Sequence, residues 1–479
     1  MEKKIKMEME MEKKIKMERK GRLNKIIEEA GICDARYEVK GMNIWLPYGL
    51  KIMKEIDNII RREVERTGHE EFCFPLLISE DSFKKEAEHI KGFGSQVYWV
   101  THGGKRKLQR KLLLRPTSET AMYPMFSLWI RTHKDLPFKT FQIINTYRYE
   151  TKQTRPLIRI REIHFFESHT CHKDYEDAED QIREDLKIMK RVADKLCIPY
   201  IANKRPEWDK FAGAEYSMGA DSYMPTGKVL QIGTIHQYKD NFSIPYNIKY
   251  KDEKGEEHFV HQTTYGMSER LLGAVIMLHS DDIGLILPPA IAPIQAVIVP
   301  ILFKGKEKKV MDFAEMLHEK ISDKKVFIDR RDDMTPGNKY YEWERKGVPL
   351  RIEIGPRDVE KNSVVLVRRD SGEKKSVSID VLRNEIGKEL EAISKSFYER
   401  AKKLMDENIV RIKDVKKETK KKIKRKIVKF NWCGRGDCGH RIEESLDISI
   451  LGTTGEKEKG RCLWCGKECD MITYGGKTY

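Results

Sequence analysis

Apolar residues recur at helical spacing in several stretches of the chain. In residues 49–66 they lie three or four positions apart, which predicts an amphipathic helix. The same criterion predicts helices at residues 112–131, 178–196, 270–278, 307–320 and 384–406. Shorter apolar runs predict strands at residues 71–78, 139–150, 228–236, 243–250, 258–264 and 284–288. Because these elements cluster instead of alternating as βαβ units, the first 290 residues predict an α+β core on an antiparallel sheet.

The pattern changes near residue 294. Short apolar strands are predicted at residues 296–301, 326–328, 350–354 and 363–367, with helical or turn segments between them. This alternation is typical of a small α/β domain. The predicted boundaries are 1–20 for a charged N-terminal extension, 21–290 for the core, 291–395 for the α/β domain and 396–479 for a C-terminal domain.

The net charge and its distribution along the chain indicate what kind of partner the protein binds. The 479 residues include 92 Lys and Arg against 76 Asp and Glu, a formal net charge of +16. Residues 411–429 hold eleven basic and two acidic side chains. That run is either a solvated helix face or a contact with a polyanion, and the unbalanced charge favours the polyanion. Met1–Glu8 repeats at Met11–Glu18, which predicts a dispensable extension, with a functional tail as the alternative.

The sequence also excludes several classes. No apolar run approaches the roughly 20 residues that a membrane-spanning helix needs, so no membrane association is expected. The N-terminus has no apolar stretch of the kind found in secretory signals. Nine cysteines are too few for a disulfide scaffold in a chain of this length. We therefore expect a cytoplasmic, multidomain protein.

Four of the cysteines are clustered near the C-terminus. They read Cys433-x4-Cys438 and, 23 residues later, Cys462-x2-Cys465. Four thiolates at such spacings can surround a tetrahedral Zn²⁺ with no position left for water, which makes the predicted zinc site structural. Unpaired buried thiols or a disulfide pair are the alternatives.

Three short segments carry the strongest functional signal. Tyr147-Arg148-Tyr149-Glu150 followed by Arg161-Glu162-Ile163-His164-Phe165 resembles motif 2 of the class II aminoacyl-tRNA synthetases. Gly266-Met267-Ser268-Glu269-Arg270 resembles motif 3. The helix at 49–66, followed by the strand that holds Pro75, resembles motif 1. Motifs 1, 2 and 3 occur in the order that this class requires.

Within that class, the chain resembles the prolyl-tRNA synthetases of archaeal and eukaryotic type. The resemblance covers about residues 21–479 and is carried by residues 113–126 (LLRPTSETAMYPMF), 155–162 (RPLIRIRE), 261–270 (HQTTYGMSER) and 351–358 (RIEIGPRD). A departure is Ser280, where the family often has glycine. About 105 residues separate Arg161 from Gly266, too few for the editing domain that the bacterial form inserts there.

The resemblance implies an antiparallel catalytic domain, an anticodon-binding α/β domain and a small zinc-binding α+β domain. It implies ATP-dependent attachment of L-proline to tRNA(Pro) through prolyl-adenylate by a homodimer that uses ATP, Mg²⁺ and structural Zn²⁺. Some misactivation of cysteine or alanine is expected, because a small pocket discriminates weakly between similar apolar substrates. The alternatives are a threonyl or histidyl synthetase and a catalytically silent RNA-binding or regulatory paralogue. The presence of Arg148 and Arg270 disfavours the silent paralogue.

The chemistry suggests roles for these side chains, since both reaction steps develop charge on phosphoryl oxygens. Arg148 is expected to clamp the α-phosphate and the substrate carboxylate, and Arg270 the γ-phosphate. Phe165 is expected to stack on adenine and Glu150 to accept from its amino group. Arg159 and Arg161 are expected on one face of a strand, near phosphates.

The resemblance completes the candidate sets. The ATP-binding candidates are Arg148, Glu150, Arg159, Arg161, Phe165, Gln231, Thr234, Ser268 and Arg270. The proline-binding candidates are Thr117, Glu119, Arg148, Glu167, His169 and His236. For His169, an ordinary packed histidine is the alternative. Glu353 and Arg357 are the candidates for reading anticodon bases.

Overall fold

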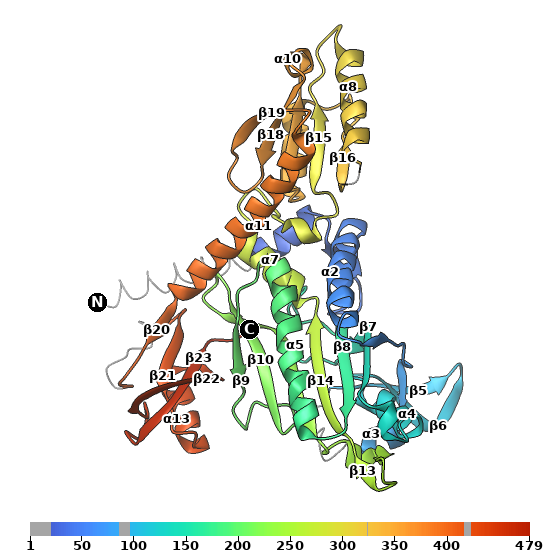
Figure 1. Ribbon diagram of the computed structural model, residues 1–479, viewed down its shortest axis with the longest axis vertical. Helices are drawn as coiled ribbons and strands as arrows, with labels where there is room; N and C mark the ends of the chain where they lie inside the picture. The colour runs from blue at the N-terminus through green and yellow to red at the C-terminus, as the bar shows by residue number, and fades with distance from the viewer. Residues whose placement is uncertain (1–20, 86–95, 323, 416–422) are drawn as a thin grey trace.

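The computed structural model describes residues 21–85, 96–322, 324–415 and 423–479. The N-terminal extension and residues 416–422 of the basic run lie outside the described residues, and so do the predictions made for them. The molecule is elongated, with a large sheet domain at one end and a smaller α/β domain at the other (Figure 1).

The large domain is built on an 11-stranded sheet. Neighbouring strands are antiparallel, except for the parallel pairs β20–β21 and β3–β7. This confirms the antiparallel α+β prediction for the core. In spatial order the strands are β20 (Ile409–Arg411), β21 (Ile427–Asn431), β23 (Glu468–Gly476), β22 (Ser449–Arg461), β9 (Ile201–Lys204), β10 (Tyr216–Tyr223), β11 (Val229–Lys239), β14 (His261–Ser268), β8 (Glu162–His172), β7 (Phe138–Tyr147) and β3 (Glu70–Glu71).

Amphipathic helices cover one face of this sheet. The predicted helix at 49–66 is α2 (Pro47–Glu65), which buries Ile52, Ile56 and Ile60 on one side. The predicted helix at 178–196 is α5 (Tyr175–Lys195), which begins at the N-cap Asp174 and packs against β11 and β14 (Figure 1). Helix α7 (Arg270–His279) follows β14 directly. Their apolar sides form one buried cluster with the sheet, so this face is closed to solvent.

Smaller elements complete the domain. The additional strands are β1 (Cys33–Asp34) paired with β2 (Ile44–Trp45), β12 (Lys249–Lys251) paired with β13 (Glu257–Phe259), and the sheet β4 (Leu77–Ser79), β6 (Arg106–Leu114), β5 (Tyr98–Gly103). The additional helical elements are α3 (Glu80–Lys85), α4 (Glu119–Trp129), α6 (Ser243–Tyr246), a 3₁₀ turn at His133–Asp135 and another at Pro289–Ile291.

Five element predictions are wrong. The strand at 258–264 is divided between β13, which ends at Phe259, and β14, which begins at His261. The strand at 71–78 is divided between β3 and β4, because Pro75 cannot donate a ladder hydrogen bond. Residues 243–250 begin as helix α6, and residues 284–288 join no strand. The predicted helix at 112–131 covers the end of β6 as well as α4, since the apolar run 112–114 belongs to the strand.

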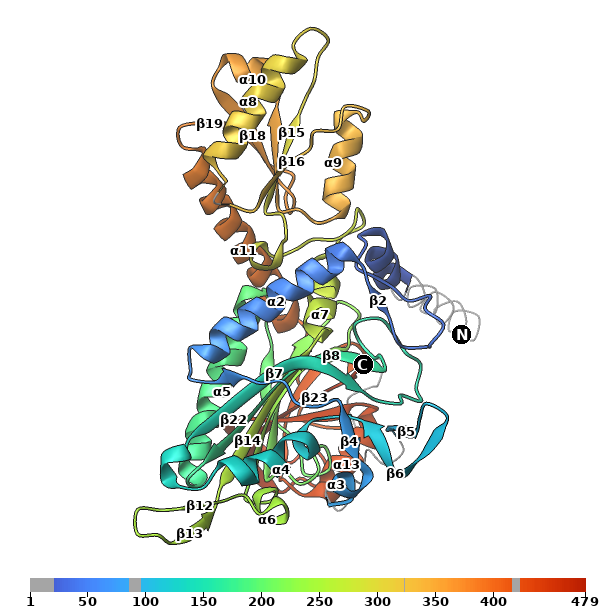
Figure 2. The same cartoon turned by 90° about the vertical axis from the view of Figure 1, so that its right-hand side faces the viewer.

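The α/β domain has a mixed five-stranded sheet in the order β16 (Val326–Ile328), β15 (Ala296–Pro300), β17 (Leu350–Ile354), β18 (Ser363–Arg368), β19 (Lys374–Ser378). Its helices are α8 (Glu307–Lys320), α9 (Pro336–Arg345) and α10 (Pro356–Glu360). Figure 2 shows α8 and α9 on opposite sides of the sheet. Alternate residues of β15 face each helix: Ile298 belongs to the cluster of α8, and Val297 and Val299 pack with Trp343 of α9.

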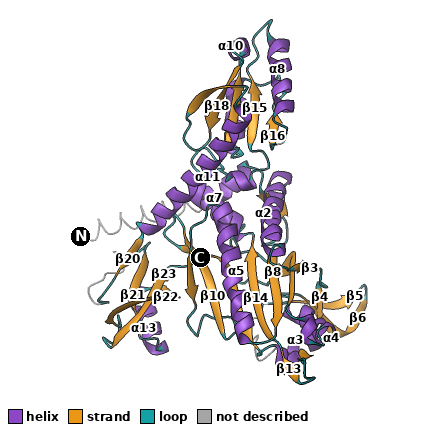
Figure 3. Cartoon of the chain, viewed as in Figure 1, coloured by secondary structure: helices purple, strands orange, loops and turns teal. Residues whose placement is uncertain are grey.

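Helix α11 (Leu382–Asp406) joins the α/β domain to the C-terminal strands (Figure 3). These strands and α13 (Gly436–Leu446) form the C-terminal domain, which does not stand apart. Its strand β22 pairs with β9 at Thr453 and Lys204, so the large sheet continues into it. Across the described ranges, no helix combines the length and the apolar character needed to cross a membrane.

Candidate active site

A cavity of about 310 Å³ opens on the sheet face opposite α5. Residues spaced by two on β14, namely Thr264, Gly266 and Ser268, line it, whereas the alternate residue Tyr265 reaches Met189 of α5 with its hydroxyl, 3.6 Å from Sδ. Strand register then aligns the neighbouring lining residues: Gly266 lies opposite Thr234 of β11 and Glu167 of β8. The antiparallel sheet thus brings three distant segments to one wall.

Two partly buried arginines face this cavity. Arg148 donates from Nε to the Pro116 carbonyl at 3.1 Å, and Arg270 donates from Nε to the Ile158 carbonyl at 2.9 Å. Burial lowers the pKa of both guanidinium groups, and the charge of Arg270 lowers that of Arg148 further. Arginine nevertheless stays protonated. Two partly buried like charges in one cavity make it a site for an anion with more than one charged group.

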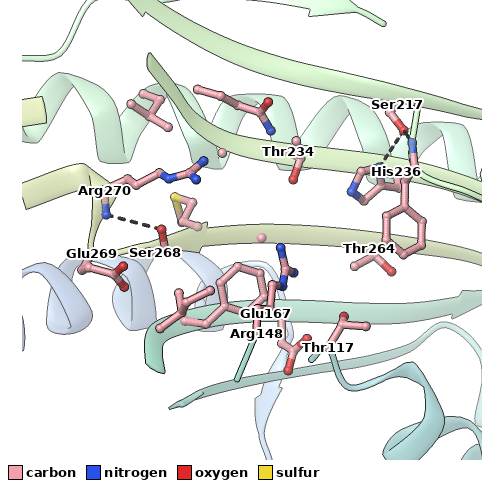
Figure 4. A pocket seen from close by; sticks show the side chains of 18 of the residues that line it. Thr117, Arg148, Glu167, Ser217, Thr234, His236, Thr264, Ser268, Glu269 and Arg270 are labelled. Carbon is pink, nitrogen blue, oxygen red and sulfur yellow. Dashed lines mark hydrogen bonds between the residues drawn. The ribbon is translucent and has the colours of Figure 1, made fainter. Parts of the chain in front are cut away.

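Figure 4 shows how the lining side chains are ordered along the cavity. Arg270, Ser268 and Glu269 lie at one end, and His236, Ser217 and Thr264 at the other. Arg148 lies between these two groups beside Glu167. The arrangement therefore provides a cationic end, an end with small polar groups, and a guanidinium group in the middle.

The cationic end also offers a flat aromatic surface. Phe165 of β8 lies over Gly266, where a Cβ atom would be only 2.8 Å from the Phe165 Cζ atom. Glycine at this position leaves room for the ring at the cavity wall. Gln231 lines the same region, and its Oε1 accepts from Arg205 Nη2 at 3.0 Å. Its amide nitrogen is therefore the group left to donate towards a ligand.

The opposite end is acidic. Thr117 donates to Glu119 Oε2 at 2.5 Å, and the Tyr238 hydroxyl donates to Glu119 Oε1 at 2.8 Å. Both Thr117 and Glu119 line the cavity although each is less than a tenth exposed. Such a carboxylate, held by two hydroxyl donors, suits an ammonium group in a small pocket.

A second carboxylate lies next to it. Glu167 Oε1 accepts from Ser118 and, at 2.8 Å, from Gln142 Nε2, while Oε2 lies 3.4 Å from His169 Nε2. Burial opposes ionisation, but the contact with His169 and the other two hydrogen bonds hold the pKa of Glu167 below its usual value. Glu167 is thus kept as an anion at the cavity wall.

Histidine 236 is a neutral group at the acidic end. Its Nδ1 lies 2.7 Å from Ser217 Oγ, and its ring lies 4.9 Å from that of Phe211. Burial lowers the pKa of His236 to about 3. The ring therefore acts as a hydrogen-bonding and packing group and not as a cation.

Two candidate residues do not reach the cavity. Arg161 donates from Nη2 to the Glu150 carbonyl at 3.1 Å and lies over the Tyr149 ring. The prediction that Arg159 and Arg161 share a strand face is wrong, because β8 begins at Glu162 and Arg159 lies in a turn. Arg159 itself does line the cavity. His169 lies behind Glu167, with Nδ1 at 3.0 Å from the Tyr123 hydroxyl.

Five further ATP-binding candidates lie at the cavity, and their proposed roles stay predictions. Glu150, Phe165, Gln231, Thr234 and Ser268 line the cavity, and Ser268 Oγ accepts from the main-chain nitrogen of Arg270 at 3.3 Å. The lining residues that the sequence reasoning missed include Arg205, Asp209, Lys210, Phe211, Ser217, Tyr238, Thr264 and Glu269.

The sequence did contain a signal for one of the missed lining residues, Glu269. Glu269 is part of the motif that also holds Arg270, and burial raises the pKa of its carboxyl to about 7. Its Oε2 has no hydrogen-bond partner among the described residues. Residues 205–211 mix charged and aromatic side chains without a period, which hid them from a search based on periodicity.

The four clustered cysteines meet in the C-terminal domain. All four sulfur atoms lie within 4.8 Å of one another, and the Sγ atoms of Cys433 and Cys465 are 3.9 Å apart. Zinc–sulfur bonds of about 2.3 Å in a tetrahedron give sulfur–sulfur distances of about 3.8 Å, so this donor set fits a zinc ion.

The two anticodon candidates differ in exposure. Glu353 of β17 is buried, and its carboxylate accepts from Arg351 Nε at 3.0 Å and from Lys374 Nζ at 3.3 Å. Arg357, in α10 at the end of the same strand, is exposed. Arg357 is therefore available to a ligand, whereas Glu353 is already paired.

Comparisons with known proteins agree with this architecture. Residues 98–279 match the family described as tRNA synthetase class II core domain (G, H, P, S and T), residues 295–389 match the anticodon binding domain, and residues 416–479 match the prolyl-tRNA synthetase C-terminal domain.

Individual relatives cover nearly the whole chain. A proline–tRNA ligase of Thermococcus kodakarensis is 56% identical over 95% of this chain and 97% of its own length. One of Pyrococcus horikoshii is 54% identical over the same shares. Among solved structures, Giardia lamblia prolyl-tRNA synthetase in complex with prolyl-adenylate superposes with a TM-score of 0.91 at 34% identity, covering 95% of this chain and 97% of that one. The chain belongs to the prolyl-tRNA synthetase family, with a class II core, an anticodon-binding domain and the C-terminal domain of that family.

Proposed function

We propose that this chain is a proline–tRNA ligase, which activates L-proline with ATP and transfers the prolyl group to tRNA(Pro). The observation that carries the proposal is the cavity in which two partly buried guanidinium groups are followed by a small acidic end. Relatives at 54–56% identity bear the name proline–tRNA ligase. The Giardia lamblia structure is described as a complex with prolyl-adenylate.

The nucleotide is proposed to occupy the cationic end. Arg270 would bind the γ-phosphate, Phe165 would stack on adenine, and the Glu150 carboxylate would accept from the adenine amino group. The amide nitrogen of Gln231 suits a ribose or phosphate oxygen. The other proposed nucleotide contacts are Arg159, Thr234 and Ser268. Mg²⁺ is expected to accompany ATP and to neutralise charge on its phosphates.

Proline is proposed to occupy the acidic end. Its secondary ammonium group would donate to Glu119 and Thr117, beside the anionic Glu167. The neutral His236 ring and the Phe211 ring would bound the pyrrolidine ring. His169 would act from behind by holding Glu167, and Arg161 by holding the chain around Glu150.

Arg148 would act where the two substrates meet. A carboxylate oxygen of proline attacks the α-phosphorus, the bond to the leaving pyrophosphate breaks, and prolyl-adenylate forms. The planar guanidinium of Arg148 can hold the attacking carboxylate and an α-phosphate oxygen together. In the second step a ribose hydroxyl of tRNA attacks the acyl carbon, and AMP leaves. Charge develops on oxygen in both steps, so fixed cations contribute most of the catalysis.

Recognition of tRNA is proposed for the α/β domain. Arg357 is exposed next to the paired Glu353, and splayed single-stranded bases are the usual targets of sequence-specific RNA recognition. Cys433, Cys438, Cys462 and Cys465 are proposed to hold one structural Zn²⁺, which would stabilise the fold of the C-terminal domain.

We further propose a homodimer located in the cytoplasm. Strand β3 is the edge of the large sheet, and it lies beside α2 in the part of the chain that resembles motif 1. An edge strand with unpaired main-chain groups is suited to a two-fold interface. Sedimentation at micromolar concentration should give about twice the 56.2 kDa of one chain, and a monomer alone would contradict the proposal.

The decisive experiment is amino-acid-dependent exchange of pyrophosphate into ATP, measured with all twenty amino acids. Proline should support the fastest exchange, with weaker exchange for cysteine and alanine. Exchange with none of them would favour a silent RNA-binding paralogue, and preference for threonine or histidine would favour a sister synthetase. Transfer to tRNA(Pro) should then be measured separately.

A further inference from the structure

One wall of the acidic end of the cavity is formed by residues 205–211, the loop between β9 and β10. Asp209, Lys210 and Phe211 of this loop line the cavity. The main-chain nitrogen of Phe211 donates to Ser217 Oγ at 2.9 Å, and the same oxygen lies 2.7 Å from His236 Nδ1. The position of the loop therefore determines the position of groups around His236.

The outer side of the same loop is held by the C-terminal domain. The Trp208 ring lies 4.3 Å from that of His440 on α13 and packs edge-on against Trp432 at 5.7 Å. It belongs to the apolar cluster that also contains Cys438 and Ile442 of α13. Trp208 is thus a partly buried side chain of the catalytic domain that packs against the core of the C-terminal domain.

Arg205 provides a second attachment at the start of the loop. Its Nη1 donates to the Leu451 carbonyl of β22 at 2.6 Å, and its Nη2 donates to Gln231 Oε1 at 3.0 Å. Asp221 pairs with both terminal nitrogens at 2.8 Å. The loop is consequently fixed to the C-terminal domain at two places, on either side of Pro206.

The contact at Trp208 leaves no spare volume. A Cβ atom added at Gly439 of α13 would lie 2.2 Å from Trp208 Cη2. At Gly436, one turn earlier in the same helix, an added Cβ atom would meet Trp208 Cζ3 at an ordinary 3.8 Å. Because alanine ordinarily stabilises a helix relative to glycine, Gly439 is explained by the indole ring and not by the helix.

From these contacts we propose that Trp208 is a positioning residue for the amino-acid end of the active site, through which the C-terminal domain sets the affinity for proline. The inference rests on the proposed proline–tRNA ligase function. It predicts that changes in α13, which does not line the cavity, alter the Michaelis constant for proline while leaving that for ATP nearly unchanged.

The test uses pyrophosphate exchange by the full-length Gly439→Ala and Gly436→Ala variants. Gly439→Ala should raise the KM for proline about tenfold or more, because small displacements of positioning groups are costly, and should change the KM for ATP less than about twofold. The matched control Gly436→Ala should behave as the wild type. Trp208→Ala should reproduce the effect of Gly439→Ala, and Trp208→Phe should restore part of the affinity.

Several outcomes would overturn the inference. A folded Gly439→Ala protein with an unchanged KM for proline would show that Trp208 serves stability alone, as would an equal rise in the KM for ATP. If Gly439→Ala does not fold, the KM values for proline of Trp208→Ala and Trp208→Phe are compared instead. Wild-type KM values for proline in both folded variants would overturn the inference. Wild-type protein without proline-dependent exchange would instead contradict the proposed function, so the two failures are distinguishable.

Discussion

Arg159 and Tyr479, 320 positions apart in the chain, are joined by a hydrogen bond of 3.0 Å from Nη2 to the main-chain oxygen. The Tyr479 hydroxyl lies 2.5 Å from Thr226 Oγ1 and donates to Met277 Sδ at 3.3 Å. A residue of the C-terminal domain therefore holds an arginine that lines the candidate ATP site.

Replacing Tyr479 with alanine should weaken this support. The variant loses the ring and hydroxyl contacts, so the segment loosens and Arg159 is held less firmly near the phosphates. We expect the KM for ATP in pyrophosphate exchange to rise by about 3- to 10-fold, within the range of one modest hydrogen bond. Lys477→Ala is the matched control, since the Lys477 side chain pairs with the exposed Asp447. Equal effects of both substitutions would assign the loss to the whole segment.

Arg148→Ala should slow adenylate formation strongly. The variant removes the proposed clamp between carboxylate and α-phosphate, and loss of one such charge-stabilising group costs about 10²- to 10³-fold in kcat. Arg148→Lys should recover little, because an ammonium group lacks the planar fork. Exchange kinetics and thermal melting measure both effects. Arg330→Ala, in a surface pair with Glu315, is the control, and near-normal exchange by Arg148→Ala would remove Arg148 from the mechanism.

Elemental analysis of the purified protein should give about one zinc per chain. Cys433→Ser should lower that value and the melting temperature, because metal binding is coupled to folding of the domain. Cys469→Ser is a matched control, since Cys469 is a neighbouring thiol outside the four-sulfur cluster. Zinc-free wild-type protein, together with unchanged melting of Cys462→Ser/Cys465→Ser, would exclude the site.

Anticodon reading can be separated from activation. Arg357→Ala should lower the rate of tRNA(Pro) charging about tenfold or more and leave proline-dependent exchange intact, because the residue is remote from the cavity and exposed. Glu353→Ala should also weaken charging, since it frees Arg351 and Lys374 from their shared partner. Glu315→Gln provides a control in the same domain. A parallel loss of exchange would show that these residues serve the fold.

Asp185 in α5 predicts a pH dependence of stability. Burial raises the pKa of its carboxyl to about 7, although Gln181 Nε2 donates to it at 2.8 Å. A folded pKa above the unfolded value means that this contribution to stability is present at low pH and is lost as the pH rises to about 7. Asp185→Asn should therefore increase the free energy of unfolding at pH 8 by about 1–4 kcal/mol.

Denaturant unfolding from pH 5 to pH 8 measures this effect. The difference between Asp185→Asn and wild type should grow with pH over that interval. Asp194→Asn is the comparison, since Asp194 pairs with Lys190 at the surface of the same helix. A difference that is independent of pH would mean that Asp185 is already ionised in the folded protein over this range, so that burial does not raise its pKa.

The sequence predicted those elements in which the buried residues recur at a regular spacing. Helices α2, α5 and α11 bury one side continuously, and their apolar residues repeat at helical spacing. Strand β6, in contrast, reads Arg-Lys-Leu-Gln-Arg-Lys-Leu-Leu-Leu and is largely exposed, so it carries no alternation that a pattern could reveal. The sequence wrongly predicts a strand at the short helix α6, because its four residues, one of them proline, are too few to establish a helical period.

In the candidate site, too, some residues could be predicted from the sequence and others are revealed only by the structure. Residues within the recognised motifs, such as Phe165 and Arg270, lie at the cavity as expected. Arg161 could not be placed by sequence, because a turn in which Leu157 has a φ of 60° precedes β8 and breaks the two-residue alternation. The role of Trp208 depends on a contact with α13 more than 200 residues later, and only tertiary structure reveals it.

The pairing of β22 with β9 also bears on attempts to shorten the protein. Strand β9 is an inner strand only because β22 covers it, at the one register pair Thr453–Lys204. A truncated chain that ends after α11 would expose the main-chain groups of β9 as a free sheet edge, together with the apolar surface beneath Ile201. Free edges of this kind recruit strands from other molecules. Such a truncated protein is expected to aggregate.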